Sequence, residues 1–258
     1  MKNTNSFILN KTLDKEAELL TLLQNYFVSL KDAPSSFLNE LAVFSSLSTD
    51  VSEIEKLVLN LKNVPYENVI LLGIGGSSLG ALAYYSAFKS EAKYKKLYVL
   101  DTLDEKDLNK VFSETKPENS IVVFISKSGQ TLETLTNLEI LHDNSYISKE
   151  RFISILSETS TLFLKMQELS NTTFTISEHL SGRYSFFSYV GLVPLGLLGF
   201  DVKKITKLAQ KHLKSYLDLG KDSEPAFSAV SLFQFAHEGK HNSLHIPDLI
   251  SKKVLSKI

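Results

Sequence analysis

Two stretches rich in Gly and Ser have the composition of anion-binding turns. LLGIGGSSLGA (71–81) contains one turn, and SKSGQTLET (126–134) follows a second apolar run. The second stretch places the hydroxyls of Ser126, Ser128 and Thr131 at the expected start of a helix, where free backbone N–H groups and the helix dipole favour an anion. Together the stretches predict phosphate binding, while a ligand-free turn and simple helix capping are the alternatives for each stretch taken alone.

The first stretch completes neither of the common nucleotide-binding motifs. The dinucleotide motif needs G-x-G-x-x-G and an acidic residue about 20 residues further on. Here Ser78 takes the place of the third glycine, although Asp101 does end the next expected strand. The sequence has no G-x-x-x-x-G-K-[ST], and neither stretch offers the metal-binding carboxylates that phosphoryl transfer needs. Neutral donors favour a phosphate held as a handle, as in a sugar phosphate, over a dinucleotide.

Arginine is rare in this sequence, which makes its two arginines further candidates for chemistry. Of the 28 basic residues, only Arg151 and Arg183 are arginines. Where lysine serves nearly every other cationic position, we expect an arginine to be used for its rigid fork of donors. A salt bridge or a helix-end contact is the structural alternative for Arg183.

The elements that must position these residues alternate between strands and helices. Short apolar runs at 68–74, 96–101, 120–126, 151–156 and 172–177 are separated by amphipathic stretches near 78–89, 104–115, 130–142 and 159–169. This alternation predicts an α/β fold with an open, doubly wound, five-stranded parallel sheet of the flavodoxin-like type. In the strand order 2-1-3-4-5, ligands bind outside the carboxyl ends of the first and third strands. The two Gly- and Ser-rich turns follow those strands, so we expect them to face each other.

Three parts are expected along the chain. Helical periodicity over 13–62 predicts a helical N-terminal segment, which we assign to 1–64. The α/β domain takes up 65–190, and 191–258 is helical and is interpreted as the start of a second, incomplete domain.

Composition narrows the partners and the location. The formal net charge is −1, which gives no electrostatic reason to expect a nucleic acid or an anionic membrane. The most hydrophobic segment, FFSYVGLVPLGLLGF (186–200), is shorter than the roughly 18–20 residues that span a bilayer, and we interpret it as buried core. The sequence has no cysteine, which excludes disulfides and thiolate metal sites and fits a cytoplasmic protein.

One segment matches a metal motif incompletely. HEGKH (237–241) has the H-E-x-x-H pattern of zinc proteases, but position 247 is Pro, and His245 and Asp248 are too close to supply the usual third ligand. Gly239 also weakens the helix that the motif needs. We therefore expect no metal, and we assign no role to three lone histidines, His142, His179 and His212.

Three segments resemble the glucose-6-phosphate isomerase family, which is built on sugar-isomerase (SIS) domains. They are GIGGSSLGA (73–81), SKSGQTLET (126–134) and EHLSGRYSFFSYVGLVPLGLLGFD (178–201). The resemblance implies interconversion of glucose 6-phosphate and fructose 6-phosphate through a cis-enediolate, without a cofactor, in a cytoplasmic enzyme that is a homodimer when full-length. It assigns the substrate phosphate to Gly76, Ser77, Ser126, Lys127, Ser128 and Thr131, and it places the catalytic Arg183 beside the reacting carbons. A guanidinium there would stabilise the enediolate charge as it develops.

The resemblance also indicates what the sequence lacks. The family's catalytic glutamate lies in a segment resembling Gln-Leu-x-x-Glu-Ser-x-Gly-Lys, and no such segment occurs here. We therefore expect a truncated isomerase that binds a sugar phosphate with little turnover. Ser181, Tyr189 and Ala81 also depart from the family's usual residues, without removing a functional group. The alternative function is a SIS-domain sensor that binds a sugar phosphate and regulates a partner without catalysis.

Overall fold

The computed structural model describes residues 49–92 and 95–226, together with residues 21, 24, 25, 47 and 228. Contacts between residues divide the chain into two units: Pro34–Gln210, and Met1–Ala33 with Lys211–Ile258. The first unit contains the sheet and every predicted site residue. In the second unit the described residues include the end of helix α10 (Val202–Leu219) and the 3-10 turn η8 (Gly220–Asp222). The domain boundaries that we expect at 64 and 190 stay predictions.

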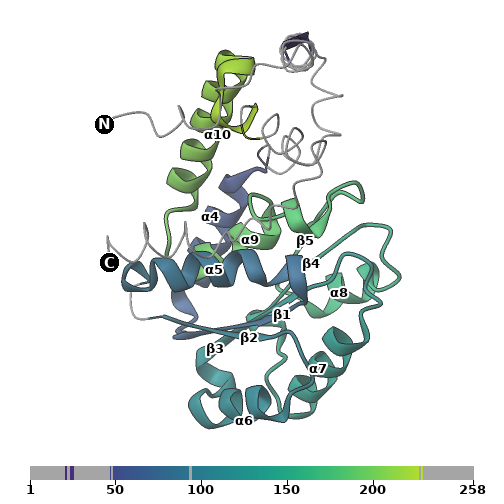
Figure 1. Ribbon diagram of the computed structural model, residues 1–258. Coiled ribbons are helices and arrows are strands. Elements are labelled where there is room, and N and C mark those ends of the chain that lie inside the picture. Colours follow the sequence, from purple (N-terminus) through teal and green to yellow (C-terminus); the bar gives the residue numbers. More distant parts are fainter. Residues whose placement is uncertain are drawn as a thin grey trace. The chain divides into compact units, whose positions relative to one another are not determined.

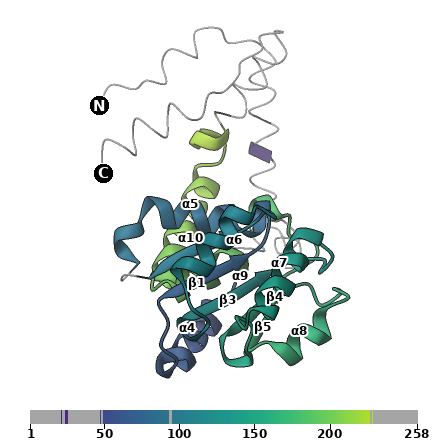
Figure 2. The same ribbon diagram turned by 90° about the horizontal axis from the view of Figure 1, so that it is seen from below.

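A five-stranded parallel sheet forms the centre of the first unit. Its strands are β1 (Asn68–Leu72), β2 (Lys96–Leu100), β3 (Ser120–Ile125), β4 (Phe152–Leu156) and β5 (Thr172–Thr175). Their order is β2-β1-β3-β4-β5, and every neighbouring pair is parallel. Figure 2 shows β1, β3, β4 and β5 side by side. The predicted fold class and the adjacency of the first and third strands are confirmed.

Helices cover both faces of this sheet (Figure 1). The helices are α4 (Val51–Asn60), α5 (Leu79–Ala87) and α9 (Tyr189–Leu197) on one face, and α6 (Glu105–Glu114), α7 (Leu132–Asp143) and α8 (Phe163–Leu169) on the other. Strand alternation divides the core between the faces: Val69 and Leu71 pack with the first group, and Ile70 and Leu72 with the second. All residues of β1 and β3 are buried because both faces are covered.

The most hydrophobic segment of the sequence forms the buried helix α9. Every residue from Val190 to Leu197 is buried, and the Ser188 side chain caps the helix by accepting a hydrogen bond from Val190 N. The Tyr189 ring packs at a tilt against Phe174 with ring centroids 4.6 Å apart, and its hydroxyl donates to the Glu53 carboxylate. No helix among the described residues has the length and apolar composition needed to cross a membrane. The interpretation of 186–200 as core therefore fits the structure.

Tyr98 on the edge strand β2 makes the stability of the fold depend on pH, which allows its packing to be tested. Tyr98 is 6% exposed and donates to Glu114 Oε2 at 3.0 Å. Burial, aided by that hydrogen bond to a carboxylate, raises the pKa of Tyr98 from 10.0 to about 12. Because the folded state favours the neutral phenol, this stabilisation is fully present below pH 10 and is lost as the pH rises towards about 12.

We therefore expect Tyr98→Phe to cost about 1 kcal/mol of unfolding free energy near neutral pH, where the hydrogen bond is lost. The difference from the wild type should shrink between pH 10 and 12, because only the wild type has this phenol to ionise. Urea unfolding of both proteins across that range measures the gap. A gap that stays constant with pH would contradict the assignment.

Candidate functional site

Two turns meet at the carboxyl edge of the sheet. β1 ends at Leu72 and β3 ends at Ile125, and the two strands pair in register from Asn68 with Ser120 to Leu72 with Phe124. The Gly-rich turn after β1 and the Ser-rich turn after β3 therefore leave the sheet side by side. This is the point where the chain reverses its winding direction, which is where open α/β sheets bind ligands.

The turn after β1 needs a glycine at position 73, where its backbone lies close to Ser77 and to the end of β3. A Cβ on Gly73 would lie 2.8 Å from Ser77 Cβ and 3.1 Å from the Ile125 carbonyl oxygen, so a side chain there would collide with the neighbouring strand. Gly75 adopts φ +58°, a left-handed conformation that glycine adopts without strain. The turn then forms the 3-10 helix η3 (Gly75–Ser77) before α5 begins. In the described part of the chain, the half-buried Ser77 hydroxyl has no hydrogen-bond partner.

The turn after β3 is held by its own hydroxyls. Ser126 Oγ accepts from Gly129 N at 3.2 Å and lies 3.4 Å from Thr131 Oγ1. Ser128 Oγ accepts from Gln130 N at 3.2 Å, at the exposed start of α7. The buried Ser126 thus shapes the turn, while Ser128 and Thr131 remain accessible to an anion. The predicted hydroxyls lie together at a helix N-terminus, an arrangement suited to a phosphate.

Arg183 is carried to this edge by a contact between two backbones. It lies in the 3-10 helix η7 (Gly182–Tyr184), which packs on η3. A Cβ on Gly76 would lie 2.3 Å from the Gly182 carbonyl carbon, so the two turns touch main chain to main chain. Ser185 Oγ lies 3.1 Å from the Gly76 carbonyl oxygen and 2.6 Å from the Gly182 carbonyl oxygen, and its hydroxyl joins both turns. This places Arg183 next to the Gly-rich turn.

The two arginines of the chain differ in what their side chains do. Arg151 Nη1 donates to the Pro65 carbonyl at 2.9 Å, at the amino end of the sheet. The exposed guanidinium of Arg183 has no hydrogen-bond or ion-pair partner among residues 49–92 and 95–226. Arg151 is therefore a structural contact, whereas Arg183 has its donors available for a ligand.

The ammonium of Lys127 already has partners. Lys127 Nζ donates to the Glu178 carbonyl at 2.7 Å and to the Leu180 carbonyl at 3.4 Å. Its own carbonyl accepts from Ser157 N at 3.1 Å. Lys127 thus joins the turn after β3 to the segments that follow β4 and β5.

Polar residues beyond those expected from the sequence gather at the same edge. A pocket of 300 Å³ lies at the carboxyl ends of β4 and β5, and it is lined by Ser157, Glu158, Thr159, Thr175, Ile176, Ser177, Glu178 and His179. The Thr159 hydroxyl donates to the Glu178 carboxylate, and Ser160 Oγ donates to the Ser128 carbonyl at 3.0 Å. Their position directly after the strands β4 and β5 is the signal that would have identified them.

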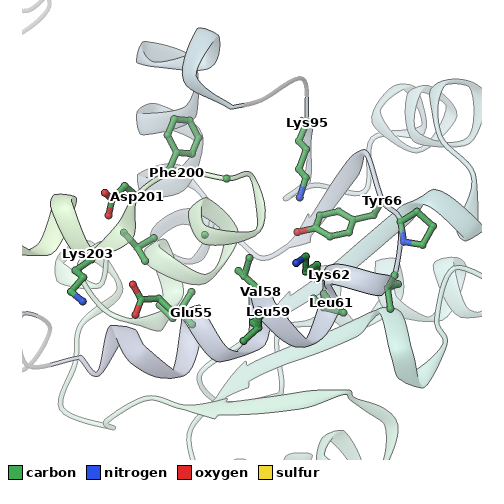
Figure 3. Close-up of a pocket in the computed structure, with 16 residues that line it drawn as sticks. Glu55, Val58, Leu59, Leu61, Lys62, Tyr66, Lys95, Phe200, Asp201 and Lys203 are labelled. Atoms are coloured by element: carbon green, nitrogen blue, oxygen red, sulfur yellow. The ribbon is translucent and has the colours of Figure 1, made fainter.

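Other candidate features lie away from this edge. Figure 3 shows a pocket of 810 Å³ beside Tyr66 and Lys95, which precede β1 and β2 and therefore mark the amino ends of the strands. There Tyr66 Oη and Lys95 Nζ both donate to the Leu197 carbonyl at the end of α9, at 2.8 and 2.9 Å. This pocket lies at the opposite ends of the strands from the two turns.

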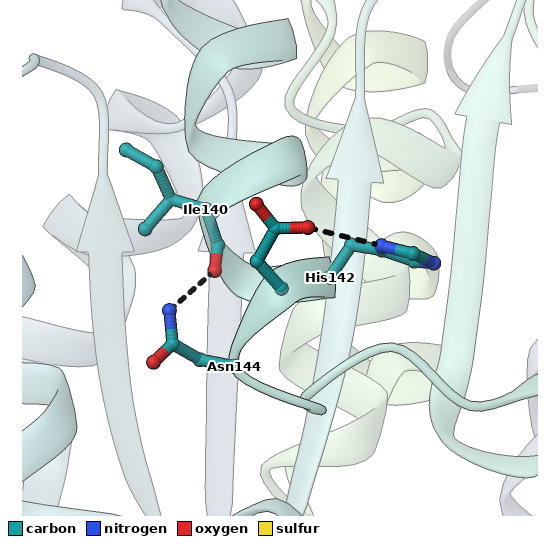
Figure 4. A network of polar contacts seen from close by, with 4 residues as sticks. Ile140, His142 and Asn144 are labelled. Atoms are coloured by element: carbon teal, nitrogen blue, oxygen red, sulfur yellow. Dashed lines mark hydrogen bonds and ion pairs between the residues drawn. The ribbon is translucent and has the colours of Figure 1, made fainter.

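The lone histidine on α7 lies away from the site. Figure 4 shows His142 at the C-terminal end of α7, with Nδ1 3.5 Å from Asp143 Oδ1, beside the hydrogen bond from Asn144 Nδ2 to the Ile140 carbonyl. The second turn lies at the other end of that helix. Within the described residues no group of three or more His, Cys, Asp or Glu is placed to hold a metal ion, and HEGKH (237–241) lies outside them.

The contact between the two glycines predicts an asymmetric response to alanine. Gly76→Ala would place its Cβ 2.3 Å from Gly182 backbone, whereas a Cβ on Gly182 would meet Gly76 Cα at an ordinary 3.4 Å. We expect Gly76→Ala to lose about 1–3 kcal/mol of stability through overpacking. The matched control Gly182→Ala should stay within about 0.5 kcal/mol of the wild type, as substitutions without a clash do. Urea unfolding compares them, and equal losses would contradict the geometry.

The sequence matches the phosphoglucose isomerase family over residues 47–217. A glucose-6-phosphate isomerase of Campylobacter jejuni is 27% identical over 222 residues, which cover 83% of this chain and 54% of that protein. One of Methanocaldococcus jannaschii is 36% identical over 154 residues, which cover 57% of this chain and 36% of that protein. The chain therefore spans about half of the first relative and about a third of the second.

Solved structures share the fold. A hypothetical protein from Thermus thermophilus superposes with a TM-score of 0.70 at 24% identity, covering 86% of this chain and 54% of that one. A glucose-6-phosphate isomerase from Chlamydia trachomatis gives 0.60 at 26% identity, covering 70% and 36%. The family match takes in β1 to β5, both turns and Arg183. The sheet, the two turns and these likenesses together show that the chain belongs to the phosphoglucose isomerase family.

Proposed function

We propose that the first unit holds the phosphate and the developing negative charge in the interconversion of glucose 6-phosphate and fructose 6-phosphate. The observation that carries this proposal is the backbone contact between Gly76 and Gly182, which brings Arg183, with its donors available, to the turn after β1. A sugar phosphate fits this arrangement, because the turns can bind its phosphate while the guanidinium at the same sheet edge lies near the carbons that react. The relatives named glucose-6-phosphate isomerase support this assignment.

The phosphate would bind between the two turns. Gly76 and Ser77 supply the first turn, Ser128 and Thr131 supply accessible hydroxyls of the second, and the buried Ser126 shapes that second turn and its amides. These donors are mostly neutral, so they hold the phosphate without polarising it for transfer. Lys127 lies in the same turn and adds positive charge nearby, although its ammonium donates to backbone carbonyls.

Arg183 would act on the reacting carbons. In the direction from the aldose, a base removes the proton on C2, the C2 electron pair forms the C1–C2 double bond, and negative charge moves to the C1 oxygen. A guanidinium held beside this cis-enediolate stabilises the charge more in the transition state than in the ground state, which is the condition for catalysis. Transfer of the C2 hydroxyl proton to the C1 oxygen, and return of the proton from the base to C1, give the ketose.

The base for this step is the part of the proposal that the chain does not supply in recognisable form. The sequence has no segment resembling Gln-Leu-x-x-Glu-Ser-x-Gly-Lys. We therefore propose that the 258-residue chain by itself binds a sugar phosphate but turns it over slowly. The homodimer of the full-length form stays a prediction.

Binding experiments test the role of Arg183. Arabinonate 5-phosphate carries a carboxylate where the enediolate oxygens form, so it should bind more tightly than fructose 6-phosphate, as transition-state analogues do. We expect Arg183→Ala to weaken arabinonate 5-phosphate by about tenfold or more, and inorganic phosphate by less than about twofold. Isothermal titration calorimetry measures both affinities.

The chain offers a matched control in its other arginine. Arg151→Ala removes the same charge at the amino edge of the sheet, and it should leave both affinities unchanged. Unchanged binding of arabinonate 5-phosphate by Arg183→Ala would contradict the proposal. Equal weakening of both ligands by Arg183→Ala would instead favour the sensor, in which the arginine serves only phosphate affinity.

Turnover tests the absence of a base. A coupled assay that follows the conversion of fructose 6-phosphate to glucose 6-phosphate should show little activity from the purified, folded chain. Rapid conversion that Arg183→Ala abolishes would mean that these 258 residues contain the base. A conversion that survives Arg183→Ala indicates a contaminating enzyme, which repurification removes.

A further inference from the structure

The segment that leads to Arg183 makes few backbone hydrogen bonds to the rest of the fold. It runs from the end of β5 at Thr175 to the start of η7 at Gly182. Its first residue, Ile176, donates its N–H to the Leu156 carbonyl at 3.1 Å, and after that its backbone hydrogen bonds are local, such as Leu180 N to the Ser177 carbonyl at 3.1 Å. The path of the chain over 177–181 is therefore set by side-chain contacts.

Lys127 supplies two of these contacts, in addition to the hydrogen bond from the Thr159 hydroxyl to the Glu178 carboxylate. Its ammonium donates to two carbonyls of the segment, those of Glu178 and Leu180, at 2.7 and 3.4 Å. Hydrogen bonds from a charged donor are stronger than neutral ones. The Leu180 carbonyl is three residues before Arg183, so the ammonium holds the chain directly in front of η7.

A second attachment lies on the other side of the arginine. Ser185 Oγ contacts the carbonyls of Gly76 and Gly182, which joins η7 to the first phosphate turn. Arg183 thus lies between two attachments, one to the turn after β3 through Lys127 and one to the turn after β1 through Ser185. The two turns that would hold the phosphate also hold the arginine-bearing segment.

We propose that Lys127 is a positioning residue for Arg183: its ammonium holds the 177–181 segment by the Glu178 and Leu180 carbonyls rather than serving as the main cation on the substrate phosphate. This inference rests on the proposed function and deepens it. Its consequence is that the effect of Lys127 on binding passes through Arg183. A lysine bound directly to the phosphate would act independently of the arginine.

The test is a double-mutant cycle read with two ligands. We expect Lys127→Met to weaken arabinonate 5-phosphate by about tenfold, because the guanidinium is no longer held in place, and inorganic phosphate by less than about twofold. In the Arg183→Ala background the same substitution should have almost no further effect on arabinonate 5-phosphate, since coupled residues are not additive. A merely structural role would weaken both ligands equally.

The controls separate loss of charge from loss of position. Lys165→Met removes a charge from the exposed surface of α8 and should leave both affinities unchanged. Lys127→Gln serves the same comparison if Lys127→Met does not fold. Hydrogen exchange should also show faster exchange of amides 178–184 in Lys127→Met, with the sheet amides unaffected.

The outcomes distinguish this inference from the proposed function. If Arg183→Ala leaves the binding of arabinonate 5-phosphate unchanged, the proposed function fails whatever Lys127 does. If Arg183 matters, but Lys127→Met weakens inorganic phosphate as much as arabinonate 5-phosphate, Lys127 acts as a direct phosphate ligand or as a general structural contact, and only this inference is overturned. Additive effects of Lys127→Met and Arg183→Ala would overturn it as well.

Discussion

The contact between the main chains at Gly76 and Gly182 is the constraint on which the candidate site depends. The two residues are 106 positions apart in the sequence, yet a Cβ on Gly76 would lie 2.3 Å from the Gly182 carbonyl carbon. No side chain separates the turns, so the backbone of η7 lies directly against the turn after β1. A site built in this way has little freedom to drift, because neither partner can adjust through rotamers.

The sheet determines which turns can take part in this contact. Parallel strands present all of their carboxyl ends at one edge, and the order β2-β1-β3 places the turns after β1 and β3 next to each other. The helices that follow begin at that same edge, so their N-terminal amides and Ser and Thr hydroxyls face a common space. Burial of both faces, by α4, α5 and α9 and by α6, α7 and α8, makes the edge the accessible part of the strands.

The cationic side chains near this edge have different surroundings. Lys127 is engaged with two carbonyls of the segment after β5, whereas Arg183 has its donors available. The difference fits their chemistry, since an ammonium is a compact charge that satisfies several carbonyls, and a guanidinium offers a planar fork for a delocalised anion. Composition alone does not distinguish Arg151 from Arg183, but Arg151 donates to the Pro65 carbonyl at the amino end of the sheet.

Local patterns in the sequence determined most of the fold and predicted the residues of the candidate site. Unbroken apolar runs separated by amphipathic stretches predicted the five-stranded parallel sheet, because burial on both faces removes alternation from a strand. The Gly- and Ser-rich turns and the rare arginine predicted which residues gather at its edge, because turn and capping chemistry acts over a few neighbouring residues.

Only the tertiary structure decided the partners of those residues: the Ser185 hydroxyl on Gly76, the Lys127 ammonium on the Glu178 and Leu180 carbonyls, and the separate surroundings of Arg151 and Arg183. These contacts join residues that are far apart in the chain and often use backbone carbonyls, which every residue type carries, so no residue pattern in the sequence identifies them.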